Sequence, residues 1–362
     1  MGELVWANLR ARPARTLLSV AAVALQVFLL LFLMGMTTGI VQEWGERVKG
    51  IGADLLVQQP NASPIIQISK PILPQSLTSR LEQLEGVESV SPVLVAINSS
   101  STTMIYAIDY PSFNRLGQGF LFHAGGAFQG PRDVIIDDIK AASKKFKVGD
   151  TVELLDETFR VCGIVEHGRG ARYFIPLKTA QELLAVEGRV SLFWVKSLGE
   201  PQVVRQHMVS LLPRHSIRLI DEYLSLMVSS NLPAVKPFTN AVILVGLVIT
   251  FLVVLLAMYT IVLERTREIG ILKALGASRL DIVRLILREA AAIALLGIAV
   301  GVGASYGIKE IVMALRPTLT IVITGQWLLQ GAGLGLLGCL VGSFYPALRA
   351  AAADPITALT YE

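Results

Sequence analysis

Between two long apolar runs the chain reads Glu264-Arg-Thr-Arg-Glu-Ile-Gly-Ile-Leu-Lys-Ala-Leu-Gly-Ala-Ser278. Residues 241–263 carry no charge, whereas four charged side chains follow within the next five positions. Such a change marks the end of a membrane-spanning segment. The connection to the next apolar run holds six basic residues, namely Arg265, Arg267, Lys273, Arg279, Arg284 and Arg288. The positive-inside rule therefore predicts a cytoplasmic loop over residues 264–289.

This loop has the pattern of a short helix followed by the start of a longer one. Apolar residues at 269, 271, 272 and 275 alternate with charged ones, so a helix here would offer apolar side chains to a partner. Gly276 is suited to end that helix. The run from Ser278 to Asp281 fits a capping box that opens the next helix.

The composition of the whole chain is that of an integral membrane protein. Of its 362 residues, 53% are hydrophobic and only 17% are charged, and the mean hydropathy is +0.59. These values are too apolar for a soluble protein of this size. The net charge of +4 is explained by basic residues at the membrane edge, so no nucleic-acid partner is expected.

Four apolar runs are long enough to cross a bilayer at 1.5 Å per residue. We predict membrane helices at 16–40, 239–263, 290–313 and 326–348. Residues 1–15 contain basic residues and Trp6 and are predicted to form an amphipathic cytoplasmic segment. The alternative for the first run is a cleaved signal peptide, but the run is long and no clear cleavage site closes it. Four crossings place both termini in the cytoplasm, with a short outer loop at 314–325 and a cytoplasmic tail at 349–362.

The last two apolar runs carry glycines at a spacing of four residues. We interpret Gly297, Gly301, Gly331 and Gly335 as helix-packing positions, because small residues allow close contact between helices in lipid. The glycine-rich run at 301–307 is not predicted to bind a nucleotide, since no strand precedes it and no phosphate-binding Lys follows.

Residues 41–238 are the only part with the pattern of a soluble domain, and they lie between the first and second membrane helices. Strands are predicted at 53–57, 87–97, 103–108, 133–136, 151–155, 159–165, 190–195 and 217–220. Helices are predicted at 75–85, 179–186 and 202–212. The overall prediction is an α-helical membrane protein with four transmembrane helices and an inserted α+β extracytoplasmic domain.

No pattern in the sequence predicts an enzyme active site. The chain lacks the G-x-x-x-x-G-K-[ST] sequence, so it is not expected to bind ATP. His123, His167, His207 and His215 lack metal-ligand spacing, and no metal site is predicted. Cys162 and Cys339 fall in different parts of the chain and are not expected to form a disulfide.

Two outer stretches are candidate contact sites. The proline-rich residues 60–74 carry apolar side chains that would guide a lipidic substrate or pack on their own domain. Residues 166–173 form a basic loop that would hold an adaptor or be a solvated turn. In both cases we favour the structural interpretation.

Residues 264–278 resemble the signature loop of the ABC-transporter permeases typified by MacB, FtsX and LolC/LolE. The residues that match this family's R-E-I-G-hydrophobic-basic-A-hydrophobic-G-A pattern, in order, are Arg267, Glu268, Ile269, Gly270, Lys273, Ala274, Leu275, Gly276 and Ala277. The family's terminal phrase is also similar to Asp354-Pro-Ile-Thr-Ala-Leu359. The resemblance implies that the matched residues form a coupling helix that docks on a separate cytoplasmic ATPase.

The resemblance also implies a domain division, partners and a function. The outer domain would comprise an α+β part at 41–115 and 197–238 and an inserted β-rich part at 116–196. The chain would be an inner-membrane permease that binds no cofactor itself, with ATP and Mg²⁺ in an ATPase dimer. A second permease subunit, identical or not, a periplasmic adaptor and membrane lipid would complete the partners. The movement would export or extract a hydrophobic or amphiphilic substrate, or alternatively activate a cell-wall hydrolase in FtsX-like signalling.

Overall fold

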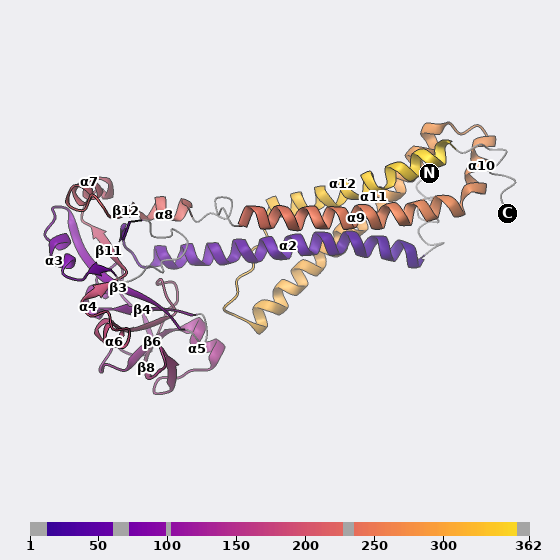
Figure 1. Ribbon diagram of the computed structural model, residues 1–362. Helices are drawn as coiled ribbons and strands as arrows, with labels where there is room; N and C mark the ends of the chain where they lie inside the picture. Colours follow the sequence, from indigo (N-terminus) through magenta and orange to yellow (C-terminus); the bar gives the residue numbers. More distant parts are fainter. Residues whose placement is uncertain (1–12, 61–71, 99–102, 227–234, 353–362) are drawn as a thin grey trace. The chain divides into compact units, whose positions relative to one another are not determined.

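The computed structural model describes residues 13–60, 72–98, 103–226 and 235–352 (Figure 1). They fall into two compact units. Among these residues, 13–39, 235–315 and 321–352 make up the helical unit, and 40–60, 72–98, 103–226 and 316–320 make up the sheet unit. The predicted segments at 1–15 and 349–362 and the proline-rich stretch at 60–74 lie wholly or largely outside the described residues.

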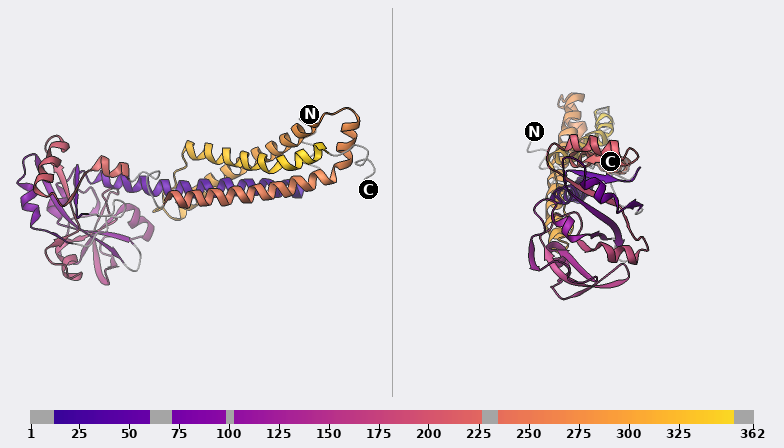
Figure 2. Two further views of the ribbon diagram at one scale, coloured as in Figure 1. Left: turned by 45° about the horizontal axis from the view of Figure 1, so that its top comes forward. Right: turned by 90° about the vertical axis from the view of Figure 1, so that its left-hand side faces the viewer.

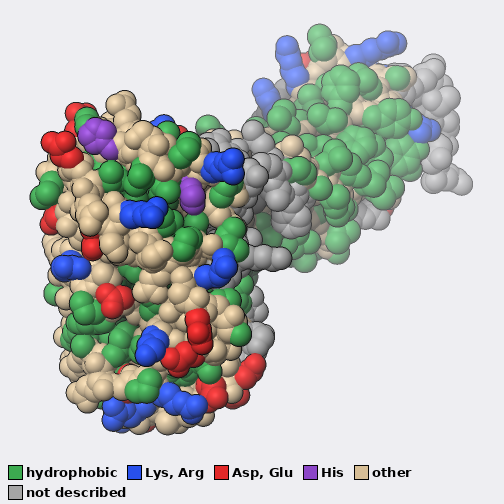
Figure 3. Space-filling view, turned by 60° about the vertical axis from the view of Figure 1, so that its left-hand side comes forward, with side chains coloured by type: hydrophobic (Ala, Val, Ile, Leu, Met, Phe, Trp, Pro, Cys, Tyr) green, Lys and Arg blue, Asp and Glu red, His purple; other side chains and the backbone are tan. Residues whose placement is uncertain are grey.

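The helical unit is built from four long apolar helices. These are α2 (Pro13–Gly50), α9 (Val235–Glu264), α11 (Arg279–Leu315) and α12 (Gly325–Ala352). Each is long and apolar enough to cross a membrane. Helix α12 packs along both α9 and α11, and Figures 1 and 2 show α9 and α12 side by side. Hydrophobic side chains cover most of the visible face of this unit in Figure 3, as expected of a surface in contact with lipid.

One polar contact lies inside the helical unit. The Thr250 hydroxyl of α9 donates a hydrogen bond to Gln26 Oε1 of α2, and both side chains are buried. Polar side chains commonly join helices in this way where water is absent.

The sheet unit is organised on one mixed sheet. Its strands are β1 (Leu55–Gln58), β3 (Val87–Asn98), β4 (Thr103–Ile108), β5 (Phe122–Gly125), β6 (Asp133–Asp137), β7 (Thr151–Leu154), β8 (Glu157–Val165), β9 (Tyr173–Pro176), β11 (Leu192–Ser197) and β12 (Ser216–Leu219). Within the described residues they follow the order β12-β1-β11-β3-β4-β9-β6-β8-β5, with β7 paired to β8. The pairs β4–β9 and β6–β8 are parallel and the others are antiparallel. Strands β2 (Leu73–Pro74) and β10 (Arg189–Val190) form a separate pair.

Short helices cover both faces of this sheet because the strand residues are apolar on both sides. One buried cluster joins the sheet to α3 (Leu77–Glu82), α5 (Asp138–Lys144), α6 (Leu177–Leu183) and α7 (Pro201–Leu211). A second cluster joins the other face to α4 (Tyr110–Asn114), α8 (Ile220–Leu226) and the last turns of α2. The second cluster holds most of the large aromatic side chains, including Trp194, Tyr106 and Phe174.

The predicted fold class is confirmed, because the structure has four candidate membrane helices with a mixed domain between the first and the second. The division of that domain into 41–115 with 197–238 and an insert at 116–196 stays a prediction, and the strand pairing crosses its boundaries. Strand β11 lies largely within residues 116–196, the predicted insert, yet it pairs with β1 and β3 of the other part. Strand β9 then pairs with both β4 and β6. One sheet therefore runs through both predicted parts, because strand pairing depends on partners that are distant in sequence.

Candidate functional site

The predicted coupling segment contains a separate short helix. Helix α10 (Thr266–Ala274) lies between the end of α9 and the start of α11. Gly276 follows it with a φ of +100°, in the left-handed region that glycine adopts most easily. Ser278 Oγ lies 2.6 Å from Asp281 Oδ2, and the Asp281 N–H points back to Ser278 Oγ at 3.3 Å. The predicted helix end and capping box are both confirmed.

A buried ion pair fixes the start of α10. Arg265 Nη1 lies 3.5 Å from Glu289 Oε2 of α11, and both side chains are at most 10% exposed. Arg265 Nε also lies 3.8 Å from Glu268 Oε2. Removing one partner of a buried ion pair is strongly destabilising, because the other charge is left buried and unpaired. This contact therefore holds the junction of α9 and α10 against α11.

The end of α10 is fixed by a different contact. Lys273 Nζ donates a hydrogen bond to the carbonyl oxygen of Ala351 over 2.9 Å, in the last turn of α12. The carbonyl end of a helix carries partial negative charge and favours such a cation. Ile269 and Gly270 are buried on the same helix. Helix α10 is therefore attached to α11 near one end and to α12 near the other.

The remaining side of α10 and its following turn is exposed. Leu275 is 81% exposed, and Leu280 at the start of α11 is 65% exposed. The structure thus divides the predicted coupling residues: Ile269 and Gly270 face inward, Lys273 and Ala277 are half-buried, and the exposed members are Arg267, Glu268, Ala274, Leu275 and Gly276. An anchored helix that presents large apolar side chains is suited to dock on another protein.

Sequence reasoning missed the residues that anchor this helix. In the sequence Arg265 is only one of six basic residues that indicate the cytoplasmic side, and Glu289 belongs to no motif. The available signal was one acidic residue at the start of an apolar run, where an unpaired charge is costly. Its partner could not be identified because α10 separates the two residues in sequence.

The four predicted packing glycines all lie against α2. A Cβ at Gly297 would lie 2.6 Å from Val23 Cβ, and one at Gly301 would lie 2.6 Å from the Ala24 carbonyl oxygen. At Gly331 and Gly335 the nearest atoms, 3.2 Å away, belong to Leu30 and Val27 of the same helix. Side chains at the first two positions would therefore collide with α2, while the other two positions are tight.

The sheet unit contains a second buried charge cluster. Arg172 Nη1 donates to Asp137 Oδ2 over 3.0 Å, and Arg172 Nη2 donates to Glu43 Oε1 on the last turns of α2. The Thr320 hydroxyl, in the connection between α11 and α12, donates to Glu43 Oε2 over 3.1 Å. Burial raises the pKa of Asp137, although the Arg172 guanidinium opposes that shift.

This cluster corrects the interpretation of residues 166–173. They were expected to be a solvated turn or an adaptor contact, yet Arg172 is buried and ion-paired within the domain. The positive charge of Arg172 predicted an exposed side chain. The carboxylates that pair with it belong to Glu43 and Asp137, which are distant in the sequence.

The histidines were expected to lack metal-ligand spacing. The fold brings His123 and His167 to one carboxylate, since His167 Nδ1 lies 3.0 Å and His123 Nε2 lies 3.7 Å from Asp138. Among the described residues no group of three His, Cys, Asp or Glu side chains is arranged to hold a metal ion. Cys162 and Cys339 are both free and buried.

Two family models match the chain. The one described as MacB-like periplasmic core domain matches residues 16–207, and the one described as FtsX-like permease C-terminal matches residues 240–355. The second match includes helix α10.

Proteins with similar sequences are named as an ABC transporter permease or as an ATP-binding/permease protein. The macrolide export ATP-binding/permease protein MacB of Bdellovibrio bacteriovorus is 24% identical over 399 residues, covering 98% of this chain and 60% of that protein. The uncharacterized ABC transporter permease MJ1507 of Methanocaldococcus jannaschii is 27% identical over 236 residues, covering 60% of this chain and 59% of that protein. The chain thus spans about three fifths of the length of these relatives.

Among solved structures, the periplasmic region of MacB from Actinobacillus actinomycetemcomitans is 20% identical with a TM-score of 0.37. The match covers 48% of this chain and 92% of that one. The extracellular domain of the transporter YknZ from Gram-positive bacteria is 13% identical with a TM-score of 0.36, covering 46% of this chain and 98% of that one.

Proposed function

The chain belongs to the family of FtsX-like ABC transporter permeases with a MacB-like periplasmic core domain, and we propose that it couples ATP hydrolysis by a partner ATPase to movement of its sheet unit. In this proposal the movement exports or extracts a hydrophobic or amphiphilic substrate. The chain itself supplies no catalytic residue. ATP and Mg²⁺ are bound by the ATPase.

One observation carries the proposal. Helix α10 is fastened to α11 through Arg265 and to α12 through Lys273, while Leu275 stands 81% exposed at its end. Because α10 contacts two membrane helices, a force applied to its exposed side is expected to move those helices with it. The exposed side chains Arg267, Glu268, Ala274 and Leu275 are the proposed contact with the ATPase.

The proposed orientation follows from the distribution of basic residues. Five basic residues lie in or near α10, and by the positive-inside rule they support a cytoplasmic location for this end of the bundle: Arg265, Arg267, Lys273, Arg279 and Arg284. Both termini are then cytoplasmic, the sheet unit is extracytoplasmic and the membrane is the inner membrane. The proposed assembly contains an ATPase dimer, a second permease subunit, bound lipid and a periplasmic adaptor.

The docking role of Leu275 is tested with the variant Leu275→Asp. The chain is purified in mild detergent from cells that make its natural partners, and co-purified proteins are quantified by mass spectrometry. An interface residue of this kind contributes enough that ATPase recovery is expected to fall about tenfold. The matched control is Leu198→Asp, a change of the same type at a 72% exposed position of the sheet unit. Equal ATPase recovery with both variants would contradict the proposal.

The variant Gly276→Pro tests whether the turn after α10 transmits movement of the ATPase to the membrane helices once the ATPase has docked. Proline fixes φ near −65° and cannot adopt the +100° found at this position. Nothing lies within 4 Å of a Cβ there, so the change acts on the backbone of the turn. We expect the complex to assemble but to lose transport. Unchanged transport by the assembled complex would contradict the role of this turn.

The match to the MacB-like core favours export over signalling. The same purification distinguishes the two. Recovery of an ATPase with a periplasmic adaptor supports export, whereas recovery with a cell-wall hydrolase supports the FtsX-like alternative.

A further inference from the structure

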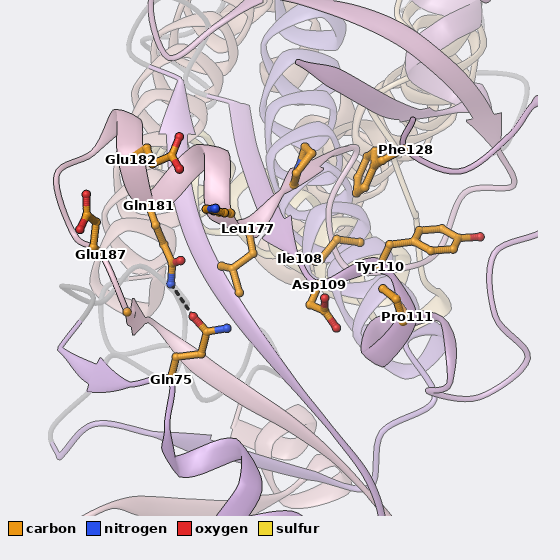
Figure 4. Close-up of a pocket in the computed structure, with 13 residues that line it drawn as sticks. Gln75, Ile108, Asp109, Tyr110, Pro111, Phe128, Leu177, Gln181, Glu182 and Glu187 are labelled. Atoms are coloured by element: carbon orange, nitrogen blue, oxygen red, sulfur yellow. Dashed lines mark hydrogen bonds between the residues drawn. The ribbon is translucent and has the colours of Figure 1, made fainter. Parts of the chain in front are cut away.

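The sheet unit contains a cavity at the ends of its parallel strands. Strands β4 and β9 run side by side and end together, with Ile108 opposite Pro176. Helix α4 begins after β4 and helix α6 begins after β9, and the two helices belong to the clusters on opposite faces of the sheet. A cavity of about 740 Å³ lies at this point (Figure 4). The carboxyl ends of parallel strands between helices are a common place for ligand binding.

The inner part of the cavity is apolar and well packed. Ile108 and Leu177 are almost completely buried. Tyr110 and Phe128 are in edge contact, with ring centroids 5.9 Å apart. Gln181 Nε2 donates to Gln75 Oε1 over 2.9 Å and joins α6 to the segment before α3 (Figure 4). These contacts form a preorganised wall for an apolar side chain.

The rim of the cavity has an excess of negative charge. It carries the carboxylates of Asp109, Glu182 and Glu187 against the single ammonium of Lys178, and all four residues are exposed. Figure 4 shows Glu182 and Glu187 on one side and Asp109 beside Tyr110 on the other. Within the part of the chain that the structure describes, no salt bridge involves Glu182 or Glu187. Carboxylates next to aromatic faces favour an ammonium or guanidinium group.

We propose that this cavity binds an extended segment of a partner polypeptide that combines a Lys or Arg side chain with a neighbouring apolar side chain. The basic group lies between the acidic residues of the rim, and the apolar group packs against the half-buried rings of Tyr110 and Phe128. Charge complementarity and the mixed lining select this occupant. The inference does not depend on whether the chain exports a substrate or transmits a signal.

Binding is measured with the full-length chain in nanodiscs of zwitterionic lipid. The probe is the fluorescently labelled peptide Gly-Leu-Arg-Leu-Gly, and binding is followed by fluorescence anisotropy against empty nanodiscs. Gly-Leu-Glu-Leu-Gly and Gly-Ser-Arg-Ser-Gly are the matched peptides, each lacking one half of the proposed chemistry. The first peptide is expected to bind at least about tenfold more tightly than either control. Equal binding of Gly-Ser-Arg-Ser-Gly would show a site for small cations and overturn the proposal.

Charge variants locate the binding within the protein. Glu182→Gln together with Glu187→Gln is expected to weaken binding of the arginine peptide about tenfold at low salt. Glu85→Gln together with Glu88→Gln makes the same charge change at exposed positions outside the cavity and is expected to leave binding unchanged. Equal weakening by both pairs would show non-specific attraction and overturn the proposal.

Charge reversal is expected to reverse the peptide preference, a result that an unfolded variant would not give. Glu182→Lys together with Glu187→Lys is expected to favour Gly-Leu-Glu-Leu-Gly over the arginine peptide, because the apolar wall stays in place while the rim changes sign. A folded reversal variant that still prefers the arginine peptide would place the binding site elsewhere.

Discussion

The helical unit and the sheet unit pack in opposite ways. In the helical unit the closest contacts occur where a side chain is missing, as at Gly297 and Gly301 against α2. In the sheet unit they involve the largest side chains, with Trp194, Phe159 and Phe174 almost fully buried. Water drives apolar side chains into a core, whereas lipid is as apolar as the side chains themselves. One chain therefore stabilises its two units by close helix contact and by apolar burial, respectively.

Both units nevertheless bury an arginine. Arg265 pairs with Glu289 in the helical unit, and Arg172 pairs with Glu43 and Asp137 in the sheet unit. Removing charges from water offsets most of the gain from such pairs. Their value lies in fixing which segments meet, since each pair joins residues far apart in the sequence.

The largest expected effect tests apolar burial in the sheet unit. Phe174→Ala removes a ring packed on Tyr106, Phe113 and Phe120, with the nearest centroid at 4.9 Å. The transfer and cavity terms together are expected to lower the free energy of unfolding by about 3–5 kcal/mol. The measurement is the urea midpoint of the full chain in detergent, followed by tryptophan fluorescence. A loss below 1 kcal/mol would mean that this aromatic cluster contributes little.

A smaller effect is expected from filling a close helix contact. Gly301→Val would place atoms against the Ala24 carbonyl oxygen, so overpacking is expected to cost about 1–3 kcal/mol. Gly303→Val is the matched control, because nothing lies within 4 Å of a Cβ at that position. The readout is unfolding in SDS, monitored by circular dichroism. If both variants behaved alike, the close contact with α2 would not stabilise the bundle.

A pH-dependent effect of about 1–2 kcal/mol is expected at Asp133. Burial raises the pKa of this carboxyl, but hydrogen bonds from the Gln129 and Gly130 amides and from Arg160 outweigh it, so the pKa is lowered from 3.8. The stabilisation is therefore present above the ordinary pKa and lost as the pH falls through the lowered one. Asp133→Asn should lower stability near neutral pH and flatten the acid limb of the urea midpoint. An unchanged acid limb would contradict this.

The smallest expected effect tests polar contact in the membrane. Thr250→Val keeps the shape of the side chain and removes the hydroxyl that donates to Gln26. Such contacts between membrane helices contribute about 0.6 kcal/mol on average. Unfolding in SDS measures the change. A loss above 2 kcal/mol would show that polar contacts, and not close packing, dominate the bundle.

Features of the fold that depend only on neighbouring residues could be predicted from the sequence. The strand at 103–108 was predicted with the observed bounds, and the start of α11 was indicated by its capping box. The membrane run predicted at 290–313 is the central part of this longer helix, which spans Arg279–Leu315.

Contacts between segments that are distant in the sequence could not be predicted from local sequence patterns. Strand β9 was not predicted, because its four residues become a strand only through β4 and β6. The short helix α10 was predicted from its residues, while the ion pair between Arg265 and Glu289 required the fold. The cavity beside α6 likewise needs residues from five separate segments.

The sheet order also determines when the domain is able to fold during synthesis. Strand β1 pairs with β11 and β12, and β4 pairs with β9, so early strands await partners made much later. Such long-range pairing is slow and leaves strand edges open. We expect β1 to stay unpaired until residues 192–219 have emerged from the ribosome, whereas β3 is able to pair with β4 as soon as both are made.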